Sequence, residues 1–79
     1  MEPVLHELDL VALRVELPAH SLVAGDVGTV VFVHGAGEAY EVEFVTADGQ
    51  TVAVETLRAV DVEPVAGRQI LHVRPLAVA

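Results

Sequence analysis

The chain has 79 residues and a formal net charge of -8, with twelve carboxylates against four basic side chains, all of them arginines. It contains no cysteine and no lysine, which excludes disulfides, thiolate metal sites, cysteine nucleophiles and Schiff-base chemistry. The excess of negative charge opposes phosphate backbones and anionic membranes, so we expect neither as a partner. The apolar fraction of 53% predicts a packed core, in a single domain spanning residues 1–79.

The first residues, Met1-Glu2-Pro3, have neither the basic start nor the apolar run of a secretory signal. No uncharged apolar stretch approaches the roughly 20 residues that are needed to span a bilayer. We therefore expect a cytoplasmic protein. Valine dominates the composition, and β-branched side chains pack well on a pleated surface, so an all-β fold is favoured.

The first half of the chain predicts two strands separated by a loop. Residues 8–17 alternate with period two, which predicts a strand whose buried side carries Val11, Leu13, Val15 and Leu17. Gly25-Asp26 predicts a turn ahead of the run 27–34, which is apolar on both faces and is therefore expected to be central or bent. Gly28 in this run indicates a bulge or a close backbone approach. Residues 35–38 form the next predicted turn.

Residues 40–45 and 51–57 predict a hairpin whose register depends on the loop between them. A two-residue Asp-Gly loop would pair Glu43 with Val54 and mix polar and apolar side chains on each face. A three-residue loop over 47–49 gives one clean apolar face, so we expect this register, with Gly49 in the left-handed bulge position. It makes the pairs Phe44–Val52, Val42–Val54, Glu43–Ala53 and Glu41–Glu55.

This register projects Glu41, Glu43 and Glu55 to one side of the sheet, with Glu41 directly across from Glu55. Like charges at opposed positions destabilise a sheet slightly. Two interpretations stay open. The carboxylates form a solvated surface in which Arg14 or Arg58 relieves the repulsion, or they form a docking face for a basic protein, where complementary charge speeds encounter.

The last third of the chain predicts a 3₁₀ turn over 57–61, a short strand over 62–65 that Pro64 ends, and a further strand over 69–74. The run 27–33 is β-prone and uncharged, so its edges must be covered. The segment 69–79 would cover it, either within one chain or by exchange between two, and a homodimer is then one expected arrangement. Residues 76–79 are expected to fray or to dock on a neighbour.

The order of several motifs resembles a family of short bacterial proteins of unknown function with an SH3-like barrel. These motifs are Leu17-Pro18, residues 24–31 (AGDVGTVV), 38–44 (EAYEVEF) and 61–65 (DVEPV). The Gly-Asp-Val-Gly-Thr-Val entry is also similar to the KOW motif of ribosomal and transcription proteins and to the barrels of nitrile hydratase subunits. The resemblance covers about residues 7–65. It implies an SH3-like barrel of about five strands, with structural roles for Gly25, Asp26 and Gly28, and leaves 66–79 as an extension carrying an extra strand.

No catalytic or metal-binding constellation emerges from the sequence. The four histidines lack the spacing of metal ligands, and Ser21, the only serine, has no motif around it. We therefore expect no enzymatic activity, no metal and no cofactor. The sequence favours an acidic protein-interaction module, of antitoxin, immunity or regulatory type, that binds a basic protein. The alternatives are a KOW-like nucleic-acid-associated barrel, which the charge disfavours, and an accessory or assembly subunit of a larger enzyme.

Overall fold

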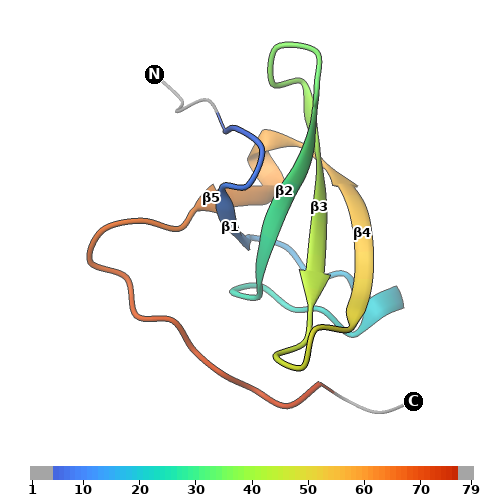
Figure 1. Cartoon of the computed structure of the whole chain (residues 1–79), viewed down its shortest axis with the longest axis vertical. Helices are drawn as coiled ribbons and strands as arrows, with labels where there is room; N and C mark the ends of the chain where they lie inside the picture. Colours follow the sequence, from blue (N-terminus) through green and yellow to red (C-terminus); the bar gives the residue numbers. More distant parts are fainter. Residues whose placement is uncertain (1–4, 77–79) are drawn as a thin grey trace.

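The computed structural model describes residues 5–76 and confirms the all-β fold (Figure 1). Five antiparallel strands form one sheet in the order β4-β3-β2-β1-β5. The elements in chain order are β1 (Leu10–Leu13), η1 (Pro18–His20), β2 (Val27–His34), β3 (Ala39–Val45), β4 (Thr51–Leu57), η2 (Ala59–Asp61) and β5 (Val62–Pro64). Within residues 5–76 no helix is long and apolar enough to cross a membrane. The more specific assignment to the SH3-like barrels stays a prediction.

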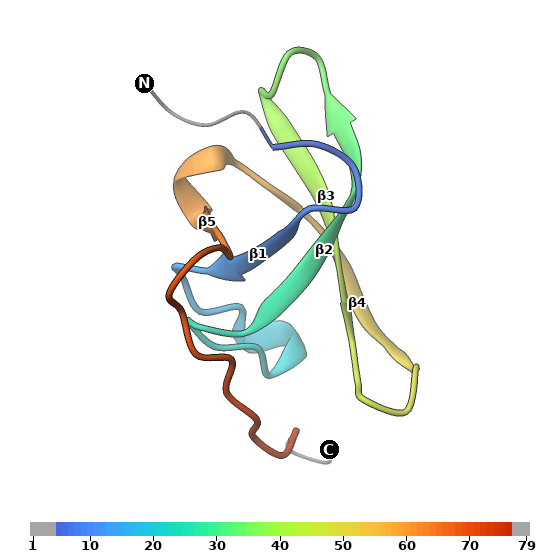
Figure 2. The same cartoon turned by 60° about the vertical axis from the view of Figure 1, so that its left-hand side comes forward.

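The sheet curls, so that β5 and β1, which is hydrogen-bonded to the first part of β2, run at an angle to the long strands β3 and β4 (Figures 1 and 2). The enclosed core is mostly aliphatic, and its fully buried side chains are Val11, Val30 and Val42. Val11 and Leu13 confirm the predicted buried side of residues 8–17, but the strand is shorter than expected. It ends at Leu13 because the chain then bends, and Leu17 instead makes an isolated bridge to Leu22 around η1.

Gly28 lies where β2 passes close to two side chains of β3. A Cβ at this position would be 2.6 Å from Cγ1 of Val42 and 2.8 Å from Cε1 of Phe44, so the expected close approach is confirmed. The bulge in β2 lies further along, between Val30 and Phe32. Within the sheet, β2 pairs with β3 along most of its length and with β1 over Val27–Thr29, so part of its apolar run is covered on both edges.

The three-residue loop of the β3–β4 hairpin is confirmed, but the predicted register is wrong. Gly49 has φ +90° and Val45 pairs with Thr51, as the loop requires. A register shift then occurs between Phe44 and Val45, so that Val52 is the extra residue on β4. Beyond this bulge the observed pairs are Phe44–Ala53, Glu43–Val54, Val42–Glu55, Glu41–Thr56 and Tyr40–Leu57.

The physical reason for this shift is the burial of Leu57. Leu57 is 5% exposed opposite Tyr40, whereas Val54 is 49% exposed. Without a bulge, the three-residue loop would put Leu57 on the solvent side, because side chains alternate with period two. One extra residue at Val52 exchanges the faces, which buries the larger Leu57 and turns Val54 outward.

The C-terminal part agrees with the sequence up to β5 and departs from it afterwards. The 3₁₀ turn and the last short strand are confirmed, as η2 and β5. Residues 69–74 do not form a strand, so that prediction is wrong; the segment passes as coil to the end of the molecule where the β3–β4 loop lies (Figures 1 and 2). The reason is that Pro64 ends β5 and Arg74 is drawn to Asp26 instead. Of the expected terminal residues 76–79, residues 77–79 lie outside the described residues.

Gly28 offers a test of the packing between β2 and β3. We expect Gly28→Ala to lower the free energy of unfolding by about 1–3 kcal/mol, because the added methyl group must displace Val42 and Phe44. Urea denaturation followed by circular dichroism measures this loss. Gly49→Ala is the control, because a Cβ there meets nothing within 4 Å and only the positive φ adds strain, about 1 kcal/mol. A Gly28→Ala chain as stable as the wild type would contradict the close approach.

Candidate functional site

The outward face of β2, β3 and β4, which we call the outer face, combines carboxylates with exposed apolar side chains. The bulge in β2 pairs Phe32 with Glu41, and the bulge in β4 pairs Val54 with Glu43. Paired residues of an antiparallel sheet share a face, so these four side chains lie on the same side. Phe32 and Val54 are each 49% exposed, and Val31 and Val45 add further exposed apolar surface.

Glu41 is held by two donors on this face. His34 Nε2 lies 2.5 Å from Oε2 of Glu41, and Oγ1 of Thr56 donates to the same oxygen at 2.7 Å. Both hydrogen bonds hold the pKa of the Glu41 carboxyl below its ordinary value, and the bond with His34 has the larger effect. The rings of His34 and Phe32 meet edge to face at 4.9 Å, so the aromatic side chain and the carboxylate are positioned through one histidine.

Glu43 lies one pleat further along β3. Its Oε2 accepts a hydrogen bond from Oγ1 of Thr51 at 2.8 Å, across the strand pair. On its β2 side its backbone partner is Thr29. Glu43 and Glu41 therefore present two oriented carboxylates on one strand, with threonine side chains around them and apolar side chains beside them.

Glu55 does not belong to the outer face, which corrects the predicted acidic cluster. Its Cα partner is Val42, which is fully buried, so Glu55 points to the opposite side of the sheet. There its carboxylate lies 3.3 Å from Nε2 of His20 in η1. The expected opposition of Glu41 and Glu55 is consequently absent, because Thr56 is the residue across from Glu41.

Three of the four arginines are engaged away from the outer face. Nε of Arg14 donates to the carbonyl of Val62 and lies 3.9 Å from Glu63. Arg58 caps η2 together with Asp61, and Arg74 pairs with Asp26. The prediction that Arg14 or Arg58 relieves charge beside Glu41 is therefore wrong, and the outer face keeps its negative charge.

The residues assigned to turns lie where the sequence placed them. Gly25 has φ +96° in the turn before β2, and Oδ2 of Asp26 accepts the backbone N–H of Val23 at 2.9 Å. Asp26 has a second role that sequence reasoning missed. Nε of Arg74 donates to its Oδ1 at 2.8 Å, and Nη2 donates to its Oδ2 at 2.5 Å. Its partner lies 48 residues away, so no local pattern could have indicated it.

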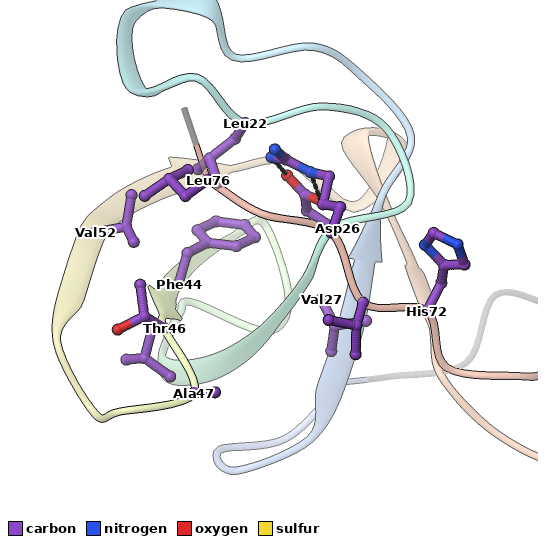
Figure 3. Close-up of a pocket in the computed structure, with 12 residues that line it drawn as sticks. Leu22, Asp26, Val27, Phe44, Thr46, Ala47, Val52, His72 and Leu76 are labelled. Atoms are coloured by element: carbon purple, nitrogen blue, oxygen red, sulfur yellow. Dashed lines mark hydrogen bonds and ion pairs between the residues drawn. The ribbon is translucent and has the colours of Figure 1, made fainter. Parts of the chain in front are cut away.

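A cleft of about 350 Å³ lies beside this ion pair, between the C-terminal segment and the β3–β4 hairpin (Figure 3). Leu22, Phe44 and Val52 form its apolar side on the body of the sheet domain, and Leu76 faces them from the C-terminal segment (Figure 3). The cleft is mainly apolar with one charged edge. Among residues 5–76 no group of three or more histidine, aspartate or glutamate side chains is arranged to hold a metal ion.

Comparison with known proteins gives one match. Residues 7–64 match the family described as a domain of unknown function (DUF4926). The match contains all five strands and ends at Pro64, before the C-terminal segment. No curated protein and no solved structure matches the chain.

The Asp26–Arg74 pair predicts a pH-dependent contribution to stability. The hydrogen bonds from Arg74 hold the pKa of Asp26 below its ordinary value of 3.8. A group with a lowered pKa in the folded state stabilises the fold above its ordinary pKa and loses that contribution as the pH falls through the folded value. We therefore expect Arg74→Gln to be less stable than the wild type at neutral pH, with the difference disappearing as the pH falls below 3.8.

Urea unfolding at a series of pH values between about 2 and 7 measures this difference. Arg68→Gln is the matched control, because Arg68 is an exposed arginine of the same segment. A difference between Arg74→Gln and the wild type that stays constant over the whole range would contradict the ion pair.

Proposed function

The chain belongs to the DUF4926 family, and we propose that it is a non-enzymatic module that binds a basic protein through its outer face. Antitoxin, immunity and regulatory roles all use binding of this kind. We also propose that the protein is cytoplasmic. The chain has no cysteine, so its fold does not depend on an oxidising compartment in which disulfides form. The single observation that supports the proposal most is the placement of Glu41 and Glu43 beside exposed Phe32 and Val54.

The two kinds of side chain on the outer face would serve different steps of binding. Aromatic side chains buried at the centre of an interface commonly supply a large share of the affinity, which is the role that we assign to Phe32. Carboxylates around such an anchor attract a positively charged surface and raise the association rate more than the affinity. Glu41 is already oriented by His34 and Thr56, so little side-chain order is lost on binding.

The charge of the chain supports a basic protein rather than a nucleic acid as the partner. The formal net charge is -8, and Arg14, Arg58 and Arg74 already pair with carboxylates of the chain. A nucleic-acid surface requires a basic stripe that neutralises phosphates. An outer face that carries Glu41 and Glu43 repels phosphates and attracts arginine and lysine.

The proposal is tested by affinity capture from the cells that encode the chain, with four baits that differ by single residues. We expect the wild type and Glu55→Gln to retain the same basic protein, because Glu55 lies on the opposite side of the sheet. Phe32→Ala is expected to weaken binding of that protein by about tenfold or more. Glu43→Gln is expected to lower the association rate and its salt dependence while leaving the dissociation rate nearly unchanged.

Surface plasmon resonance with the captured protein, at low and high salt, measures these rates. A partner that binds all four baits with equal affinity would contradict the outer face as the docking surface. A captured partner that is a nucleic acid would contradict the proposed class of partner.

A further inference from the structure

The C-terminal segment 66–76, which we call the arm, is hydrogen-bonded to the rest of the described chain through a single side chain, that of Arg74. The N–H of Val65 donates to the carbonyl of Leu10 at 3.0 Å, and this is the last backbone hydrogen bond to the sheet within residues 5–76. From residue 66 to residue 76, the hydrogen bonds that reach the rest of the described chain all come from the guanidinium of Arg74. The arm is therefore held at its far end.

The guanidinium of Arg74 binds to a site that offers it several oriented hydrogen-bond acceptors. Both carboxylate oxygens of Asp26 accept from Arg74, and the carbonyl of Ser21 accepts from Nη2 at 2.9 Å. Asp26 is itself fixed by the N–H of Val23, and only 17% of its side chain is exposed. Paired, parallel hydrogen bonds of this kind combine strength with geometric specificity. Asp26 and Ser21 thus form a specific binding site for an arginine side chain.

Most other side chains of the arm are exposed to solvent and are not packed against the sheet of their own chain. Ile70 is 95% exposed, Val73 is 91% exposed and Leu71 is 63% exposed, although all three are large aliphatic side chains. The cleft of about 350 Å³ between Leu76 and Phe44 is also left unfilled. A small domain gains stability from covering such surface, and nothing in the described part of the chain covers it.

Gly67, which lies between β5 and most of the arm, allows the chain to change direction. Gly67 has φ +65° and forms part of a bend, and a Cβ at this position would meet nothing within 4 Å. Glycine adopts positive and negative φ with similar ease, so a change of φ at this one residue alters the direction of the arm. The arm can therefore move away from the rest of its own chain while β5 stays paired with β1.

We propose that two copies of this chain exchange their arms, so that Arg74 of each copy binds Asp26 and Ser21 of the other. A second copy of the chain carries the same arm and the same binding site for Arg74. Each contact that the arm makes within one chain can therefore form in the same way between two copies. The exchange is symmetric, since each copy gives one arm and receives one. The proposal uses a surface other than the outer face and is independent of the proposed function.

A charge exchange between two variants tests the proposal directly. Asp26→Arg places an arginine against Arg74, and Arg74→Asp places a carboxylate against Asp26, so neither variant can seat its own arm or pair with itself. When the two are mixed, both junctions of an exchanged heterodimer carry opposite charges. We expect native mass spectrometry to find monomers for each variant alone and a heterodimer in the mixture. The double variant Asp26→Arg/Arg74→Asp is the control and should dimerise as the wild type does.

A mixture that contains only the two monomers would overturn the proposal. Asp26→Arg also removes the acceptor of the Val23 N–H, so a second measurement uses variants that keep Asp26. The wild type, Arg74→Gln and Arg68→Gln are refolded at about 1 mM and examined by sedimentation equilibrium. We expect the wild type and Arg68→Gln to dimerise alike, and Arg74→Gln to dissociate about tenfold more readily. A wild-type chain that stays monomeric, or an Arg74→Gln chain that dimerises equally well, would overturn the exchange.

Discussion

Each side chain of a strand in this small sheet must face either the core or water, and one extra residue in a strand exchanges the two faces. Two such residues, Val31 in β2 and Val52 in β4, therefore decide what the molecule shows to its surroundings. The first bulge lets Val30 enter the core and turns Phe32 outward. The second buries Leu57 and leaves Val54 on the surface. The outer face exists because these two bulges act on neighbouring strands.

The same constraint separates the carboxylates. Glu41 and Glu43 remain on the outer face with Phe32 and Val54, while Glu55 faces the other side and meets His20. An acidic surface with an aromatic centre suits a basic protein partner better than a plain acidic cluster would, because burial of an aromatic ring supplies affinity that exposed charge does not. Asp26 and Ser21, which bind Arg74 of the arm, are not among the outer-face side chains Phe32, Glu41, Glu43 and Val54.

Local patterns were enough to predict most of the elements. The β2 strand, the Gly49 loop, the 3₁₀ turn and β5 follow from runs of β-branched residues and from the positions of glycine and proline. The bulge in β4 was not predictable from that strand alone, since TVAVETL alternates acceptably in either register. The burial of Leu57 against Tyr40 decides between the two registers, and it depends on the neighbouring strand. The strand expected over 69–74 does not form, although β4 and β5 each have a free edge; this segment is held instead by the pairing of Arg74 with Asp26. The Asp26–Arg74 contact depends on tertiary structure alone.

The most direct test of this account is the pairing of β3 with β4 in solution, because the composition of the outer face depends on it. Cross-strand nuclear Overhauser effects between backbone protons report which residues stand opposite each other. We predict contacts of Val42 with Glu55 and of Glu43 with Val54, together with a Val45–Thr51 contact beside the loop. Contacts of Val42 with Val54 and of Glu43 with Ala53 would show a hairpin without the Val52 bulge and would contradict it.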